Sequence, residues 1–345
     1  MNEPTADERT GTEDELVGAL RRVLSGEQPG VELGVGDDAA VVDLGRGQAV
    51  LTADVLVEGV HFDRALISPR DLGAKAVVVN VSDVAAMAAS PRFALASVVL
   101  GPDVDPAWVV ELEGGMRAAC DEYALSLVGG DLSSGPVSVV SVSVVGEVAP
   151  GWYVTRAGAT PGDRIVVTGT LGASAGGLAL SRARPGDVQA ALGTDWGRGL
   201  VRAHVRPVAR VGEGATLAEA GATAMMDVSD GLALDLSRLC AASGVGCRVR
   251  TFDVPVAPDV VQLASVLPVE PLELALSGGE DYELLATLPA EAVADATAAV
   301  EDRFGVRLTE VGEVTEGGAL VAVDAPGAER PLEPKGWDHL GRARR

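Results

Sequence analysis

The sequence contains little cysteine, little aromatic character and little positive charge. Its three cysteines, Cys120, Cys240 and Cys247, form no Cys-x-x-Cys pair. This argues against a disulfide framework or a structural zinc site and favours small buried side chains. Only 27 basic residues stand against 50 acidic ones, for a net charge of −23. Binding to nucleic acid or to an anionic membrane is therefore not expected, and a protein of this charge needs another source of positive charge to handle phosphates.

Long apolar segments and standard nucleotide motifs are missing as well. The longest apolar stretches fall short of the ~20 residues that a membrane span needs, and residues 1–15 have no export-type apolar segment, so we expect a cytoplasmic protein. No Gly-x-x-x-x-Gly-Lys-[Ser/Thr] occurs, and the only lysines are Lys75 and Lys335, which excludes a P-loop kinase. Residues 34–39 match a loose dinucleotide fingerprint but continue as a strand pattern, which disfavours a Rossmann oxidoreductase.

The length of 345 residues predicts about two domains of mixed α and β structure. A segment rich in Gly and Pro, residues 149–162, is the best boundary. We therefore expect a flexible N-terminus over residues 1–12, an N-terminal domain over 13–150 and a C-terminal α+β domain over 151–345. The expected helices cover residues 13–24, 69–89, 106–123, 231–243 and 289–304, and the expected strands cover 48–62, 94–100, 137–148, 164–168, 282–288, 306–314 and 319–323.

Six acidic clusters interrupt the apolar segments, at residues 34–38, 52–54, 80–83, 129–131, 227–231 and 277–281. We expect most of them in glycine-punctuated loops beside buried strands, where backbone can approach a ligand closely. Carboxylates that converge on one site repel each other unless a cation neutralises them. Oxygen donors without His or Cys suit Mg²⁺, which commonly bridges to substrate phosphates. The alternative for any single cluster is a set of turn and N-cap aspartates.

Individual residues allow more than one interpretation. Asn80 and Asp83 share a face of the helix at 69–89, whereas Lys75, two turns earlier, is interpreted as a surface lysine with a buried stem. His61 could hydrogen-bond a substrate or be structural, and the three histidines are too widely separated for a zinc site. Trp337 could stack on a flat or cationic ring or simply pack.

Taken together, these motifs resemble the thiamine-monophosphate kinase family, in the superfamily of aminoimidazole ribonucleotide synthetase. The resemblance covers about residues 12–340. Each of its eight motifs is weak alone, but their occurrence in the order of the family makes the resemblance specific. They are residues 32–40, which include Gly34-Val35-Gly36-Asp37-Asp38, then 52–62, 75–87, 129–131, 155–156, Asp227-Val228-Ser229-Asp230-Gly231-Leu232, 277–284, and Lys335-Gly336-Trp337-Asp338-His339.

The resemblance implies a two-domain aminoimidazole ribonucleotide synthetase-like fold whose N-terminal sheet pairs across a homodimer. It implies Mg²⁺-dependent direct transfer of the ATP γ-phosphoryl group to thiamine monophosphate, without a protein nucleophile. By matching position, the Mg²⁺ ligands are Asp38, Thr52, Asp54, Asp83, Asp131, Asp227 and Asp230. The ATP contacts are Gly130, Asp131, Arg156 and Ser229, and the substrate contacts are His61, Glu280 and Trp337.

Two positions depart from the family pattern. Ala53 stands where a hydroxyl residue is usual, and Leu132-Ser133-Ser134 follows Asp131 where an Arg is often found. The alternatives are another ATP-dependent enzyme of the superfamily, such as aminoimidazole ribonucleotide synthetase, or a non-catalytic acidic metal-binding protein. Segment 335–339 disfavours the first, and magnesium binding without turnover would indicate the second.

Overall fold

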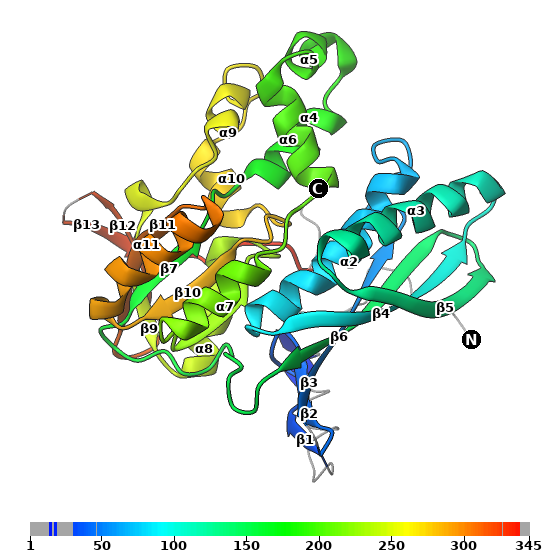
Figure 1. The fold of residues 1–345 in the computed structure, drawn as a ribbon. Coiled ribbons are helices and arrows are strands. Elements are labelled where there is room, and N and C mark those ends of the chain that lie inside the picture. The colour runs from blue at the N-terminus through cyan, green and yellow to red at the C-terminus, as the bar shows by residue number, and fades with distance from the viewer. Residues whose placement is uncertain (1–13, 16, 19–29, 46, 326, 339–345) are drawn as a thin grey trace, which may run out of the picture.

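The computed structural model describes residues 14–15, 17–18, 30–45, 47–325 and 327–338 and contains two mixed β-sheets with helices packed on them (Figure 1). Of the helix expected at residues 13–24, residues 14, 15, 17 and 18 are described and are helical. The expected flexible segment 1–12 and His339 lie outside the described residues. No helix in the described ranges is long and apolar enough to cross a bilayer.

The first sheet has six strands in the order β1-β2-β3-β6-β4-β5. Its longest pairing joins β3 and β6 antiparallel, from Gln48 opposite Val148 to Val57 opposite Val139. Alternation of buried and partly buried residues along β6 places one face of this sheet in the core and leaves the other more open. The strands are β1 (Val31–Leu33), β2 (Ala40–Asp43), β3 (Gln48–Val57), β4 (Ser90–Leu100), β5 (Ser126–Ser134) and β6 (Val139–Val148).

Two helices, α2 (Pro69–Ala86) and α3 (Pro106–Glu122), cover the buried face of this sheet. Each begins with a proline in its first turn, after a capping side chain. Helix α2 is buried almost all round, because it packs on the first sheet, on α3 and on elements of the second half. The two helices approach closely at Gly73, where a Cβ atom would lie 2.0 Å from the carbonyl oxygen of Leu112.

The second sheet has seven strands in the order β13-β12-β9-β11-β7-β10-β8. Helices α7 (Val211–Glu219) and α11 (Val293–Phe304) contribute to one hydrophobic cluster against this sheet, and α8 (Leu232–Ser243) and α10 (Pro271–Ser277) contribute to another. The strands are β7 (Arg164–Thr168), β8 (Ala224–Asp227), β9 (Gly246–Arg250), β10 (Leu284–Leu288), β11 (Leu308–Thr315), β12 (Leu320–Ala325) and β13 (Ala328–Pro331).

A separate group of helices packs around its own small core beside the second sheet. Its members are α4 (Ala173–Arg182), α5 (Pro185–Leu192), α6 (Asp195–Val205) and α9 (Pro258–Leu263). Two short 3-10 turns, η1 (Thr251–Asp253) and η2 (Ala290–Ala292), connect neighbouring elements.

Most expected elements of the described chain form with shifted ends. Thr52 and Asp54 lie within β3, inside the strand expected at residues 48–62. Asp131 lies within β5, where a loop was expected instead of a strand. Extended backbone alternates its side chains between the two faces of a sheet, so a strand can present Thr52 and Asp54 side by side toward the helices without any loop. The three cysteines are buried and free, as expected.

Candidate active site

A cavity of about 990 Å³ lies where the two halves of the chain meet. Its wall includes residues of β3, of α2 and of the turns that follow β1 and β8. Eleven of the predicted site residues line it: Asp38, Thr52, Asp54, His61, Asp83, Arg156, Asp227, Ser229, Asp230, Glu280 and Trp337. Chain segments far apart in sequence thus bring most of the predicted residues to one place.

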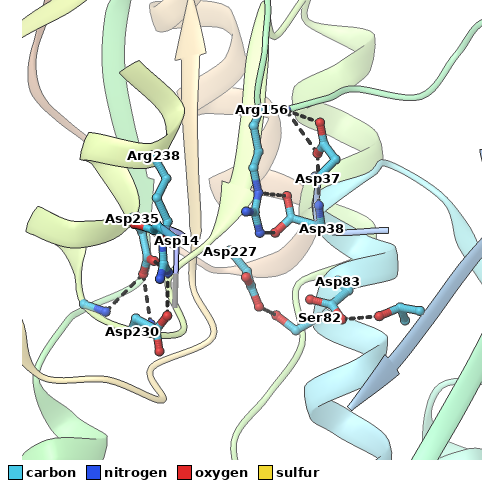
Figure 2. A network of polar contacts seen from close by, with 12 residues as sticks. Asp14, Asp37, Asp38, Ser82, Asp83, Arg156, Asp227, Asp230, Asp235 and Arg238 are labelled. Carbon is cyan, nitrogen blue, oxygen red and sulfur yellow. Dashed lines mark hydrogen bonds and ion pairs between the residues drawn. The ribbon is translucent and has the colours of Figure 1, made fainter. Parts of the chain in front are cut away.

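Three carboxylates form the centre of this site. Asp38 follows β1, Asp83 lies in the last turn of α2, and Asp227 ends β8. Each offers an oxygen within 4.8 Å of the others. Hydroxyl groups orient two of them, because Thr52 Oγ1 donates to Asp83 Oδ2 at 2.5 Å and Ser82 Oγ donates to Asp227 Oδ2 at 2.5 Å (Figure 2).

The electrostatics of this cluster favour a bound cation. Burial, with the nearby charges of Asp54, Asp227 and Asp38, raises the pKa of Asp83 well above its ordinary value. Burial and the charge of Asp38 likewise raise the pKa of Asp227. A divalent cation would offset this repulsion, and a set of carboxylate oxygens with adjacent hydroxyls fits Mg²⁺ rather than zinc. The residues present therefore fit the metal that the sequence predicts.

Arg156 places a positive charge beside Asp38. Its guanidinium group binds Asp38 in a fork, with Nη2 at 2.7 Å from Oδ1 and Nε at 3.1 Å from Oδ2. Its backbone N–H also donates to Asp37, at 3.2 Å from each carboxylate oxygen. Burial and the neighbouring charge of Asp38 raise the pKa of Asp37 to about 6. A planar fork of this kind also matches the oxygens of a phosphate group.

Asp54 and Asn80 connect β3 to α2 beside the three carboxylates. The Asp54 backbone N–H donates to Asn80 Oδ1 at 2.9 Å, and Asn80 in turn donates from Nδ2 to the Ala76 carbonyl at 3.0 Å. This fixes the helix against the strand at the level of Asp83. The expected shared face of Asn80 and Asp83 is confirmed, since both side chains bond to β3.

Asp230 belongs to a second polar group in the same cavity wall. Arg238 of α8 donates to Asp230 Oδ2 at 2.5 Å and to Asp235 Oδ1 at 3.2 Å, and its Nε lies 3.2 Å from Asp14 (Figure 2). Asp235 also accepts from the backbone N–H groups of Asp230 and Gly231 at 3.0 Å. Asp235 therefore holds the turn at the start of α8, and Arg238 gives Asp230 a counter-charge within the protein.

Comparisons with known proteins show the family of this chain. Residues 36–148 match the family described as AIR synthase related protein, N-terminal domain, and residues 160–325 match the corresponding C-terminal domain. Thiamine-monophosphate kinase of Escherichia coli O157:H7 is 39% identical over 311 residues, which cover 90% of this chain and 92% of that protein. The enzyme of Aquifex aeolicus is 37% identical over 308 residues, covering 89% and 92%. This chain belongs to the thiamine-monophosphate kinase family.

A solved structure of a family member shares the fold. AaThiL complexed with AMPPCP and TMP superimposes with a TM-score of 0.81 at 34% identity, covering 95% of this chain and 97% of that one. The mixed two-domain architecture expected from the resemblance is therefore confirmed for this member of the family.

Two predicted residues lie away from the cavity of their own chain. Gly130 and Asp131 are exposed on β5, the edge strand of the first sheet, and neither is among the described residues that line the cavity. Leu132-Ser133-Ser134 continues the same exposed strand, whereas Ala53 lines the cavity from β3.

The interpretation of Lys75 as a surface lysine was wrong. Its residue is 1% exposed, because α2 is enclosed by both halves of the chain. The apolar run on both sides of Lys75 was a signal for this burial, since a helix that is apolar all round has no solvent face. Other residues that the sequence reasoning missed are Ser82 and His204. Ser82 contacts Asp227 across 145 residues of sequence, a pairing that no local pattern indicates.

Proposed function

We propose that this chain catalyses Mg²⁺-dependent transfer of the γ-phosphoryl group of ATP to the phosphate of thiamine monophosphate, giving thiamine diphosphate and ADP. The observation that carries the proposal is the convergence of Asp38, Asp83 and Asp227, with Arg156 at Asp38, in one cavity of a thiamine-monophosphate kinase family member. Relatives of this chain carry that enzyme's name, and AaThiL was solved with AMPPCP and TMP.

In this proposal the metal ligands are Asp38, Thr52, Asp54, Asp83, Asp227 and Asp230. When bound, Mg²⁺ would neutralise phosphate charge and align the reacting groups. The attacking group is already an anionic phosphate oxygen, so the protein needs neither a strong base nor a nucleophile of its own. Arg156 would offset charge on the transferring group, and Ser229 would contact ATP.

The acceptor would occupy the part of the cavity lined by His61, Glu280 and Trp337. The indole of Trp337 is 47% exposed and can cover an aromatic ring. The backbone at Trp337 lies close to Asp230, since the backbone N–H of Trp337 donates to the Asp230 carbonyl at 3.0 Å. Glu280 supplies a negative charge, which suits the thiazolium cation and the amino group of thiamine and disfavours a second phosphate there.

We further propose that the chain acts as a homodimer through the open face of the first sheet. Phe93, Leu95, Val55 and Val128 are 46–59% exposed in this sheet, opposite the face that α2 and α3 cover, and apolar exposure of this kind marks an interaction surface. Gly130 and Asp131 lie beside these residues, and we assign both to a site shared with the partner chain. The division of the chain at residue 150 and the cytoplasmic location remain parts of the proposal.

Product analysis tests the proposed reaction directly. Purified protein is incubated with ATP, with and without Mg²⁺, and with a panel of phosphorylated acceptors that includes thiamine monophosphate. Thiamine diphosphate and ADP should form together, only when Mg²⁺ is present. Turnover of another acceptor with none of thiamine monophosphate would reject the reaction.

Light scattering after gel filtration tests the dimer. We expect twice the chain mass for the wild-type protein and a monomer for Leu95→Glu. Val110→Glu is the matched control, because Val110 is 73% exposed on α3, away from the open face. A monomeric wild-type protein would contradict the dimer without affecting the fold.

A further inference from the structure

A buried cation in the cavity wall has no role in the proposed function so far. Lys75, in the middle of α2, lines the cavity but is 1% exposed. Its Nζ atom lies 2.8 Å from Glu280 Oε1 and donates to the His204 carbonyl at 3.1 Å. That carbonyl belongs to the last turn of α6, where unpaired carbonyl groups favour a positive charge.

His204 holds the other oxygen of the same carboxylate. Its Nδ1 atom lies 3.2 Å from Glu280 Oε2 and 3.1 Å from Ser174 Oγ. Two helices therefore converge on Glu280, which lies in the loop after α10: α2 through Lys75 and α6 through His204. The Glu280 side chain remains 26% exposed, toward the cavity.

The loop that carries Glu280 is fixed by its backbone. The Glu280 N–H donates to the Ser229 carbonyl at 2.7 Å, and Tyr282 N–H donates to the Val228 carbonyl at 2.9 Å. Glu280 itself has a φ of +67°, a left-handed conformation that costs free energy for a residue with a side chain. Such a conformation persists only where the surroundings determine it, and the contacts to Lys75 and His204 are among those surroundings.

The same helix links Glu280 to the metal-binding carboxylates. Lys75 precedes Asp83 by eight residues in α2, which places them about 12 Å apart along the helix axis. A rigid helix therefore sets the separation between the three central carboxylates and the Glu280 carboxylate. A phosphorylated acceptor with a cationic ring at its far end would be held at both ends by groups fixed to one element.

We propose that Lys75 and His204 are positioning residues that hold the Glu280 carboxylate against the cationic, non-phosphate end of the acceptor. This inference rests on the proposed function, because the acceptor it names is thiamine monophosphate. Neither side chain needs to touch the acceptor. Lys75 keeps Glu280 ionised and orients it from behind, and His204 fixes its second oxygen.

Kinetics with a double-mutant cycle test the inference. Lys75→Met should raise KM for thiamine monophosphate by about tenfold, since one charge-assisted contact is lost, while KM for ATP changes by less than about twofold. Lys75→Arg keeps the charge and should recover about half of the lost affinity on a logarithmic scale. In a Glu280→Gln background, Lys75→Met should add less than about twofold, because its effect acts through Glu280. His204→Leu should raise KM for thiamine monophosphate by less than Lys75→Met does, again with little change in KM for ATP.

A matched control and a binding measurement separate the possible outcomes. Arg117→Met breaks another 2.8 Å cation–carboxylate pair, on the exposed surface of α3, and should change neither KM. Equal increases in both KM values, or a full Lys75→Met effect without Glu280, would overturn the inference.

Calorimetric titration with thiamine monophosphate measures the binding affinity of the same variants without turnover. Wild-type protein that binds but does not react would reject the proposed function alone, whereas an active enzyme unaffected by Lys75→Met would reject the inference alone. Wild-type protein that does not bind thiamine monophosphate rejects both.

Discussion

The cavity contains carboxylates in two opposite electrostatic situations. Asp83 and Asp227 face other carboxylates, and burial together with this repulsion raises their pKa values. Glu280 is also removed from bulk water, yet the charges of Lys75 and His204 outweigh its burial and lower its pKa to about 2. The charges of the neighbouring groups, rather than burial, therefore decide whether the pKa of a carboxylate in this cavity rises or falls. One part of the cavity thus depends on cations from outside, whereas the other is neutralised by the chain itself.

Removing a central carboxylate should have the largest effect. We expect Asp227→Asn to lower ADP formation at least a hundredfold or so at fixed Mg²⁺, because several kcal/mol of metal-assisted stabilisation depend on this ligand set. Circular dichroism should show the fold retained. Asp121→Asn, a surface carboxylate of α3, is the control. A loss of less than about tenfold would place Asp227 outside the catalytic metal site.

The pairing of Glu280 with Lys75 and His204 should make the stability of the fold depend on pH. Its folded-state pKa of about 2 lies below the ordinary value of 4.5. The ionised carboxylate therefore stabilises the fold fully above pH 4.5, and this contribution is lost as the pH falls toward 2. A pKa difference of this size corresponds to about 3 kcal/mol.

Urea unfolding of Glu280→Gln measures this contribution. The variant should be less stable than wild type at pH 6, by up to about 3 kcal/mol, and the difference should shrink near pH 3. Glu111→Gln, an exposed carboxylate in α3, should show no such dependence. A difference that is the same at both pH values would mean that Lys75 and His204 do not set the charge of Glu280.

Asp54 tests how far the metal-dependent group extends along β3. Its charge acts on Asp83, and its backbone is tied to Asn80. We expect Asp54→Asn to lower turnover by about tenfold to a hundredfold with little loss of fold, since it removes one of several proposed metal ligands. The Mg²⁺ concentration for half-maximal rate should rise as well. An unchanged rate would remove Asp54 from the metal set.

The sequence indicated the three central carboxylates but not the group around Glu280. Asp38, Asp83 and Asp227 could be found because each lies in a short polar motif between apolar segments. Lys75 could not be assigned a role, because its partner carbonyl at His204 is 129 residues away and its meaning depends on how α2 and α6 pack. For the fold, a proline in the first helical turn identified α2 and α3, and apolar alternation identified β6. The polar, glycine-containing strand β5 carries neither signal and was missed.

The smallest expected effect concerns the backbone that carries Glu280. A Cβ atom at Gly279 would lie 2.7 Å from the Ser229 carbonyl oxygen, closer than real contacts allow, so the loop must shift in Gly279→Ala. We expect a loss of about 1–2 kcal/mol in unfolding free energy, the usual cost of modest overpacking. KM for thiamine monophosphate should rise with little change for ATP, because the shift moves Glu280 and leaves the three central carboxylates in place. Gly318→Ala, which has open space around the added methyl group, is the control. If Gly279→Ala instead raised KM for ATP and for thiamine monophosphate equally, the two parts of the cavity would be coupled through Ser229. They would then differ in electrostatics but would not move independently.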